Sequence, residues 1–337
     1  MNGKYLGRLS TEDPLHHHLG EYIAPQFGCF DRQASYRVFQ ADWAKDVYYY
    51  EEERGWFRVV GKFFKPSRTR SWDQARGVGE TEYNNLCYLR DLGFSGAPFH
   101  VVRPLVFQPD INNLLVLEYL EGELLSQVIN QAVFFGRRRK LFRKLSVLAG
   151  FLASLHNRTA GDWTINFNES RQYLSTLLDL LIHKRGLGRE HAGELHYLGD
   201  MWRERDFMWE DRSVLVHGDA TPANFMFGPG SNVRVFDLER MKWADRVFDV
   251  GRLAGELKHF FFRSTGDPWS AEPFIGHFLW EYAGHFPDHD RAFRSITRRV
   301  PFYLGLTLLR IAKNHWVDSD YRKRLVEEAK QALRAKT

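Results

Sequence analysis

The chain has 337 residues, of which 44% are hydrophobic and 26% charged, with a net charge of +5. These values are those of a folded globular protein and exclude a disordered chain, and the length allows one large domain or two. Two cysteines, Cys29 and Cys87, exclude a disulfide framework or a cysteine-only zinc site. We expect a cytoplasmic protein without a membrane span, and the small charge excess does not predict nucleic-acid binding. The oligomeric state stays open.

Aromatic and β-branched residues dominate the first third of the chain. They predict strands at Ser35–Gln40, Val47–Glu51, Trp56–Phe64, Val101–Phe107 and Asn113–Tyr119. Between the third and fourth of these strands, leucines with helical spacing predict a helix over Glu80–Leu92, which Gly93 would end. The first third therefore reads as a small, mostly antiparallel sheet with one helix.

Helical patterns dominate after Gly122, and the amphipathic segment Lys140–Asn157 is the clearest of them. A short β interlude follows at Val214–His217, Phe225–Phe227 and Val233–Leu238, and helices return from about Asp249. We expect an α+β chain with a β-rich lobe at residues 1–117, a hinge at 118–122 and an α-rich lobe at 123–337. Residues 1–20, with three consecutive histidines, are expected to form a flexible extension. Such a pair of lobes would leave a cleft for a ligand.

The densest group of polar residues lies in the β interlude. The sequence His217-Gly218-Asp219 follows an apolar strand, Asn224 comes five residues after Asp219, and Asp237 ends a later strand. Phosphoryl transfer from a nucleotide needs a carboxylate to orient the attacking hydroxyl, and amide and carboxylate oxygens to hold Mg²⁺. The pattern therefore predicts phosphotransferase chemistry.

A lysine and a glutamate in the first third add to this set. Lys62 lies inside a predicted strand, where a charge is unusual unless it faces a cleft. Glu82, in the helix that follows, is a suitable partner, and Glu80 competes for the same role. A lysine held by a helix glutamate and reaching nucleotide phosphates is the kinase arrangement.

The chain resembles the aminoglycoside phosphotransferase and choline kinase superfamily, small-molecule kinases with a protein-kinase-like fold. The pattern H-G-D-x-x-x-x-N followed by D-x-E is matched from His217 to Glu239. Asp249 resembles the aspartate that supports the catalytic loop in that family. With Lys62 and Glu82 included, the similarity runs to about Leu257 and implies a bilobal α+β kinase-like fold.

The resemblance also implies roles for the loop residues. Asp219 would be the catalytic base that orients the acceptor hydroxyl, and His217 would order the loop. Asn224 and Asp237 would be ligands of Mg²⁺, and Glu239 would support the metal site.

The remaining implied roles concern the nucleotide, which we expect to be ATP. Lys62 would bind its α- and β-phosphates, with Glu82 holding the lysine. The hinge segment from Glu118 to Leu120 would offer backbone groups to the adenine ring. The sequence does not decide between ATP and GTP.

The loop that covers the nucleotide has no recognisable glycine-rich pattern. If the first two strands are the predicted ones at 35–40 and 47–51, that loop is Ala41–Lys45. If Glu21–Phe27 is the first strand instead, the loop is Gly28–Ser35, where Ser35 or backbone amides would contact phosphate. We favour the second possibility.

The sequence favours a small acceptor over a protein. Gly218 stands where a protein kinase has the arginine that meets a phosphorylated activation segment, and the chain leaves little room for such a segment. We expect a sugar, a sugar conjugate or an amino alcohol, bound against Arg246–Arg263 and Trp269–Phe286. An aminoglycoside is a further alternative, but it is polycationic and would need an acidic wall, and no such wall is obvious in the stretch Asp249–Arg263. Alternatives are a kinase of a lipid-linked or lipopolysaccharide-core sugar and a nucleotide-binding pseudokinase.

Overall fold

The chain divides into two units, and the first takes residues from two separate stretches of sequence. The computed structural model describes residues 3–31, 33–41, 45–228, 230 and 232–336. The first unit contains Met1–Gly122 with Gly228–Glu239, and the second contains Glu123–Phe227 with Arg240–Thr337. The sequence analysis had placed residues 228–239 in the α-rich lobe. They belong to the first unit because β12 (Val233–Val235) pairs in parallel with β6 (Phe99–Val101).

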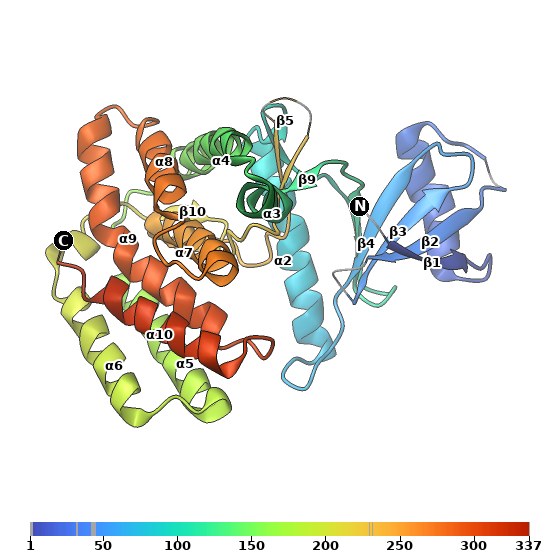
Figure 1. Cartoon of the computed structure of the whole chain (residues 1–337). Coiled ribbons are helices and arrows are strands. Elements are labelled where there is room, and N and C mark those ends of the chain that lie inside the picture. The colour runs from blue at the N-terminus through green and yellow to red at the C-terminus, as the bar shows by residue number, and fades with distance from the viewer. Residues whose placement is uncertain (1–2, 32, 42–44, 229, 231, 337) are drawn as a thin grey trace. The chain divides into compact units, whose positions relative to one another are not determined.

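The first unit contains a six-stranded antiparallel sheet (Figure 1). In spatial order its strands are β1 (Gly3–Arg8), β2 (Tyr36–Ala41), β3 (Val47–Glu52), β4 (Arg58–Phe63), β8 (Leu114–Glu118) and β7 (Pro104–Gln108). Lys62 on β4 pairs with Val47 on one side and with Leu115 on the other. The lysine therefore sits in an inner strand, where both neighbouring strands fix its backbone. The predicted segment Val101–Phe107 is divided between β6 and β7, and β5 (Ser95–Gly96) pairs with β6.

The helix of the first unit, α2 (Trp72–Asp91), begins eight residues before the predicted start. Ser71 and Gln74 form a reciprocal capping box, which fixes this earlier start. Two weak helix formers, Gly77 and Gly79, obscured it in the sequence. A Cβ at Gly79 would lie 2.5 Å from the Phe107 ring, so the glycine allows the helix to approach the sheet closely.

The expected flexible extension at residues 1–20 is wrong for residues 3–20, the part that the structure describes. Residues 3–8 form β1, and they are followed by α1 (Pro14–His18), a π-helical turn η1 (Leu19–Ile23) and a 3₁₀ turn η2 (Ala24–Phe27). Leu15, Leu19 and Ile23 recur every four residues and are buried in the same core as strand residues such as Tyr36 and Val59. The helix of the three histidines is thus part of the core.

The same observation corrects the proposed first strand. Residues 21–27 are helical, so Gly28–Ser35 is not a turn between adjacent strands. The predicted strands at 35–40 and 47–51 are confirmed as β2 and β3. The loop between them contains residues 42–44, which lie outside the described part of the chain.

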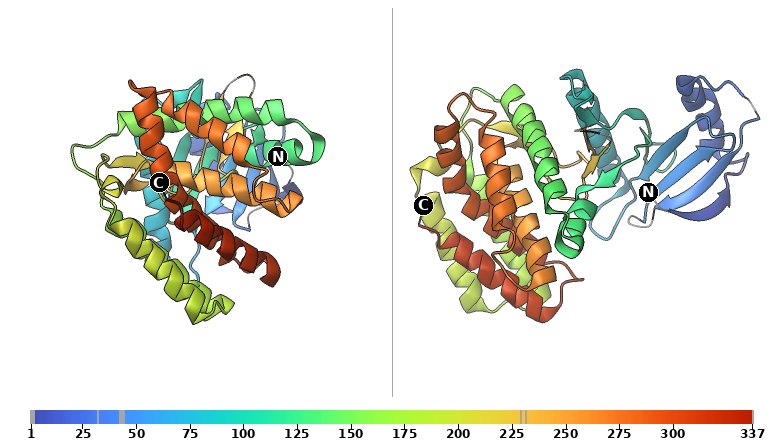
Figure 2. Two further views of the ribbon diagram at one scale, coloured as in Figure 1. Left: turned by 60° about the vertical axis from the view of Figure 1, so that its left-hand side comes forward. Right: turned by 45° about the horizontal axis from the view of Figure 1, so that its top comes forward.

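The second unit is built from helices (Figures 1 and 2). They are α3 (Leu125–Phe135), α4 (Arg138–Arg158), α5 (Phe167–Arg185), α6 (Arg189–Arg203), the short η3 (Asp206–Met208), α7 (Val247–Thr265), α8 (Glu272–Ala283), α9 (His289–Ala312) and α10 (Ser319–Leu333). Helix α9 packs against both α7 and α10, and α4 packs against α8. In the described residues, none of the helices combines the length and the apolar run that crossing a bilayer requires.

Short strands interrupt the helices of the second unit. The predicted strands at 214–217 and 225–227 are confirmed as β10 (Val214–Val216) and β11 (Phe225–Phe227). Strand β10 pairs with β13 (Lys242–Ala244), which the sequence analysis did not predict, and β11 pairs with β9 (Glu123–Leu124). All residues of β10 and β11 are buried, so the loop between them starts and ends in the core.

A group of buried ion pairs lies next to the first residue of α7. Arg299 on α9 is 1% exposed and donates to Asp245 Oδ1 at 2.7 Å and to Asp211 Oδ2 at 2.5 Å. Asp245 Oδ1 also accepts from the amide of Val247, the first residue of α7. Burial raises the pKa of Asp245, and the Arg299 guanidinium opposes that rise. Arg299 therefore stabilises a buried carboxylate where α7 begins.

Replacing Arg299 by Met should destabilise the protein strongly. The substitution leaves Asp245 buried without its countercharge, and breaking a buried pair in this way costs about 3–5 kcal/mol of unfolding free energy. Chemical denaturation of Arg299→Met, with Arg294→Met on the exposed face of the same helix as the control, measures this loss. Equal stability of the two variants would contradict the assigned role.

Candidate active site

The loop after β10 carries His217, Gly218 and Asp219. Gly218 has φ = +77°, and a Cβ at this position would lie 1.9 Å from the carbonyl oxygen of Arg240. The left-handed backbone and the close approach both favour glycine over every other residue. The sequence therefore fixes a tight turn directly before Asp219.

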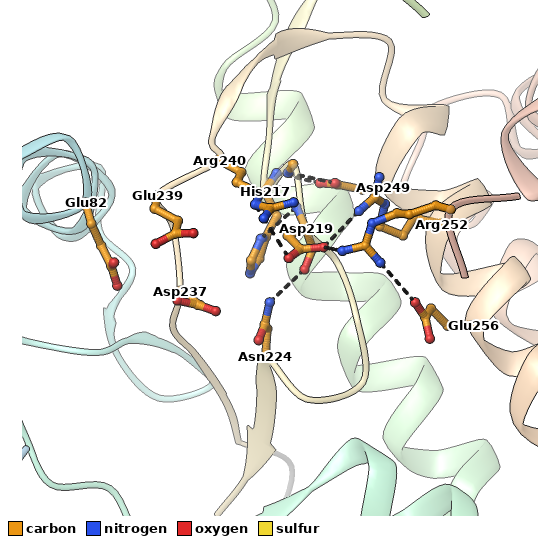
Figure 3. Close-up of polar contacts among 12 residues, drawn as sticks. Glu82, His217, Asp219, Asn224, Asp237, Glu239, Arg240, Asp249, Arg252 and Glu256 are labelled. Carbon is orange, nitrogen blue, oxygen red and sulfur yellow. Dashed lines mark hydrogen bonds and ion pairs between the residues drawn. The ribbon is translucent and has the colours of Figure 1, made fainter. Parts of the chain in front are cut away.

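A single carboxylate, that of Asp249 on α7, holds the backbone of this turn (Figure 3). Its Oδ2 accepts the amide hydrogen of His217 at 2.6 Å, and its Oδ1 accepts that of Gly218 at 3.0 Å. Asp249 is 0% exposed, so these bonds are made without competition from water. The turn is consequently anchored to α7.

A histidine and a tyrosine complete the support of Asp249. His156 Nε2 lies 3.3 Å from Asp249 Oδ2, and His156 Nδ1 lies 2.7 Å from the Tyr282 hydroxyl. Burial lowers the pKa of His156, so the network is best satisfied by a neutral ring that donates from Nε2 and accepts from the tyrosine at Nδ1. Burial opposes the charge of Asp249, but the hydrogen bonds from His156 and His217 outweigh it and lower the pKa of this carboxyl.

Three arginines surround the carboxylate of Asp219. Its Oδ1 accepts from Arg252 Nη1 at 2.8 Å and from Arg310 Nη2 at 2.6 Å, while Arg240 Nε lies 3.9 Å from Oδ2. Burial would raise the pKa of Asp219, but the guanidinium groups of Arg310, Arg252 and Arg240 outweigh burial and hold this pKa below its usual value. Asp219 is therefore ionised at neutral pH.

The predicted loop residues His217, Asp219 and Asn224 are brought together in the structure. The Asn224 amide donates to the backbone carbonyl of Asp219 at 2.9 Å, and the amide of Asp219 donates to His217 Nδ1 at 3.3 Å. His217 is fully buried, with its ring 5.3 Å from that of Phe225. Bonding through Nδ2 leaves the oxygen end of Asn224 facing away from the loop carbonyl.

In the first unit, the Lys62 ammonium contacts three acidic side chains. Its Nζ donates to Glu82 Oε2 at 2.7 Å, contacts Asp237 Oδ1, and lies 3.3 Å from Glu239 Oε2. Asn85 Nδ2 donates to the backbone carbonyl of Leu238 at 2.8 Å, which ties the acidic segment to α2. The structure thus brings the predicted residues Lys62, Glu82, Asp237 and Glu239 together, and Glu80 instead pairs with Arg76 at 2.8 Å.

The charges of this cluster suit a divalent cation. Oxygen atoms of Glu82, Asp237 and Glu239 lie within 4.8 Å of one another. Burial opposes the charge of Lys62, but the three carboxylates outweigh it and raise the lysine pKa. Burial and the two neighbouring aspartate and glutamate charges raise the pKa of Glu82 to about 7 against the attraction of Lys62. One ammonium therefore leaves negative charge in excess, and hard oxygen donors are the ligands Mg²⁺ prefers.

The backbone at Asp237 is unusual. This residue has φ = +67°, in the left-handed region that side chains other than those of glycine, asparagine and aspartate rarely adopt. The conformation costs free energy that the surrounding contacts offset, and such positions concentrate at functional sites. It places the Asp237 carboxylate beside Lys62.

Three further residues were predicted to contact the nucleotide, namely Glu118, Leu120 and Ser35. Glu118 ends β8, and its carboxylate lies 2.5 Å from His100 Nε2 and 2.6 Å from the Arg103 amide. The Glu118 amide already donates to the Arg103 carbonyl, and Leu120 is 7% exposed. Ser35 lies just before β2, where its carbonyl accepts from the Glu53 amide.

The sequence analysis missed the residues that support and surround Asp219. His156 and Arg310 lie in helices whose patterns are typical of ordinary amphipathic helices, so no local signal distinguished them. Arg252 lies within Arg246–Arg263, a segment expected to bind the acceptor, but no pattern singled it out. Its proximity to Asp219 depends on the packing of α7 and α9, which no motif encodes.

Comparisons with known proteins were made for the whole chain. A sequence model described as the phosphotransferase enzyme family matches residues 35–292. A search among curated protein sequences gave no match.

Solved structures share the fold. An ADP-bound aminoglycoside phosphotransferase is 16% identical, with a TM-score of 0.58, and the match covers 96% of this chain and 98% of that one. An ethanolamine kinase from Plasmodium vivax is 13% identical, with a TM-score of 0.58 and coverage of 96% and 89%. A choline kinase from Streptococcus pneumoniae is 16% identical, with a TM-score of 0.53 and coverage of 87% and 91%. The predicted α+β kinase-like fold is confirmed.

Changing Asp249 to Asn should loosen the turn before Asp219. An amide has one acceptor oxygen, so its NH₂ group would oppose one of the two backbone amides that the carboxylate accepts. We expect a loss of about 1.5–3 kcal/mol of unfolding free energy and faster hydrogen exchange at the amides of His217 and Gly218. Asp290→Asn, at an exposed position of α9, is the control. Unchanged exchange at both amides would refute the anchoring role.

Proposed function

The chain belongs to the phosphotransferase enzyme family and is a small-molecule phosphotransferase. We propose that it uses Mg²⁺ and transfers the γ-phosphoryl group of ATP to a hydroxyl group of its acceptor. The observation that carries the proposal is the Lys62 cluster, in which a partly buried ammonium is held by a helix glutamate and by Asp237. A lysine fixed in this way is suited to binding nucleotide phosphates.

In the first unit, groups from both of its sequence stretches bind the nucleotide. Lys62 binds the α- and β-phosphates and Glu82 keeps its ammonium in place, while backbone groups from Glu118 to Leu120 bind the adenine ring. Asp237 and Asn224 serve as ligands of Mg²⁺. The metal, when bound, would neutralise phosphate charge that develops as the bond to ADP breaks.

Asp219 acts on the acceptor. Its ionised carboxylate accepts a hydrogen bond from the acceptor hydroxyl and so orients the oxygen toward the γ-phosphorus. A bond forms between that oxygen and the γ-phosphorus, and the bond from the γ-phosphorus to the bridging oxygen breaks, so that ADP leaves with the electron pair. The hydroxyl proton passes to Asp219 and then to solvent.

Of the acceptor classes expected from the sequence, the site favours a sugar or a sugar conjugate over an amino alcohol, which is a cation at neutral pH. The arginines on Asp219 count against an aminoglycoside, because a polycationic acceptor would have to approach guanidinium groups of the same sign. Hydroxyl groups of less basic compounds meet no such repulsion.

Removing the Asp237 carboxylate should abolish binding of Mg-ATP. A ligand present at about 100 times its dissociation constant stabilises a native protein by about 2.7 kcal/mol, so the wild type should show a clear rise in melting temperature with Mg-ATP and Mg-GTP tested in parallel. We expect no rise for Asp237→Ala and an undiminished rise for Asp110→Ala, an exposed acid of the same unit. A normal rise in Asp237→Ala would overturn the assignment.

Asp219→Asn should separate catalysis from nucleotide binding. We expect phosphoryl transfer to fall about 10²–10⁴-fold, because the amide cannot accept the proton, while the melting-temperature rise with Mg-ATP persists. The assay is ADP release with a panel of sugars and amino alcohols, and Asp320→Asn, at an exposed position of α10, is the control. A nucleotide-binding pseudokinase would instead show the same rate in both variants.

A further inference from the structure

Positive charge gathers around Asp219 in excess of what this carboxylate neutralises. Arg252 and Arg310 both donate to the same oxygen of Asp219, and Arg240 lies at its other oxygen (Figure 3 labels Arg240 and Arg252). Lys313 follows Arg310 by three residues along the same chain segment, at the cap of α9. Two oxygens therefore face three guanidinium groups, with an ammonium close by.

The charges of these arginines also act on Lys313. Burial lowers the pKa of this lysine, and Arg310, Arg240 and Arg252 lower it further. In the described part of the chain, the Lys313 ammonium has no ion pair. The four cations thus act on one another within one region of the second unit.

The carboxylates in the same region offset only part of this positive charge. Glu256 on α7 lies 3.5 Å from Arg310 Nη1, and burial raises its pKa to about 7 despite the arginines. Asp219 and Glu256 are the carboxylates with which Arg252 and Arg310 interact in the described residues. Arg252 and Arg310 thus share two carboxylates, one of them partly protonated near neutral pH, and Lys313 adds a third positive charge, so these groups together are net positive.

One buried donor of this group is without a partner. Arg252 is 3% exposed, and its Nε makes no hydrogen bond in the part of the chain that the structure describes. A buried cation with an unpaired donor destabilises a fold, and one carboxylate for each guanidinium would serve stability better. The excess of cations at the catalytic loop therefore requires an explanation other than folding.

An anion bound next to Asp219 supplies that explanation. Guanidinium groups bind phosphate and carboxylate through paired, charge-assisted hydrogen bonds. Because Arg252 and Arg310 touch the carboxylate that orients the acceptor hydroxyl, an anion bound to them belongs to the acceptor molecule itself. The net charge would attract such a molecule and repel amines.

We propose that the acceptor is an alcohol carrying a phosphate or carboxylate group near the reacting hydroxyl, and that Arg310, with Arg252 and Lys313, binds that anionic group. The proposal rests on the proposed phosphotransferase function and specifies its substrate class. It assigns Arg310 to acceptor binding and leaves the nucleotide to the Lys62 cluster.

Acceptors matched in shape and different in charge test the proposal. ADP release is measured with glucose, gluconate, glucose 6-phosphate and glucosamine, and with glycerol, glycerate, glycerol 3-phosphate and choline. We expect turnover, or competitive binding to the Mg-ADP-bound enzyme measured by thermal shift, for the anionic compounds only. Comparison of the carboxylate compounds with the phosphate compounds shows which of the two anionic groups the enzyme binds. Better turnover or tighter binding of the neutral or cationic compounds, or no effect of any anion, would overturn the proposal.

Variants of Arg310 locate the interaction. Arg310→Gln should raise the KM of an anionic acceptor, or its dissociation constant on the Mg-ADP-bound enzyme, about tenfold or more, and Arg310→Lys should restore part of the loss. Arg294→Gln removes the same charge from an exposed position of α9 and should change neither. If Arg310→Gln instead weakens Mg-ATP binding and leaves selection among acceptors intact, the arginine serves the nucleotide and the proposal is wrong.

The two proposals fail in different ways. Absence of any Mg-ATP or Mg-GTP stabilisation in the wild type would contradict the proposed function. Intact nucleotide stabilisation without preference for anionic compounds would contradict the acceptor class alone. Melting temperatures of the Arg310 variants without ligand control for loss of folding.

Discussion

The Asp249 carboxylate accepts two consecutive backbone amides from the turn that carries Asp219, and the geometry of the loop depends on that contact. A helix supplies the anchor, so the packing of α7 determines where the loop lies. Arg299 and Asp245 stabilise the first turn of α7, and His156 and Tyr282 hold the anchor from the other side. The position of one reactive carboxylate is thus set by buried polar groups from four helices.

The Lys62 cluster and the group of arginines around Asp219 carry opposite net charges. In the first unit three carboxylates surround a lysine, and in the second three arginines surround an aspartate. Each arrangement retains a net charge after its internal pairs are formed, which a structural ion pair would not need. The negative cluster suits a cation with its phosphates, and the positive cluster suits an anionic organic molecule. The charge left over in each cluster therefore indicates the chemistry of its ligand.

Local patterns in the sequence predicted the parts of the structure that depend on neighbouring residues. Strands β2, β3, β10 and β11 followed from runs of aromatic and β-branched residues, and the motif around Asp219 placed its own loop. The N-terminal segment was misread because three consecutive histidines are typical of an exposed segment, although Leu15, Leu19 and Ile23 keep helical spacing. Arg310 could not be assigned, since a charge in a helix is usually solvated and only the packing of α9 on α7 brings it to Asp219. The roles of the individual site residues remain predictions.

The N-terminal segment also determines where the folding domain begins. The region shared with the family starts at residue 35, yet Leu15, Leu19, Ile23 and Ala24 are all buried against Tyr36 and its neighbours. A fragment cut at the start of the shared region would expose the aromatic face of β2 and β3 to water and to other copies of itself. The boundary defined by homology and the boundary needed for a soluble recombinant fragment are therefore about 30 residues apart in this protein.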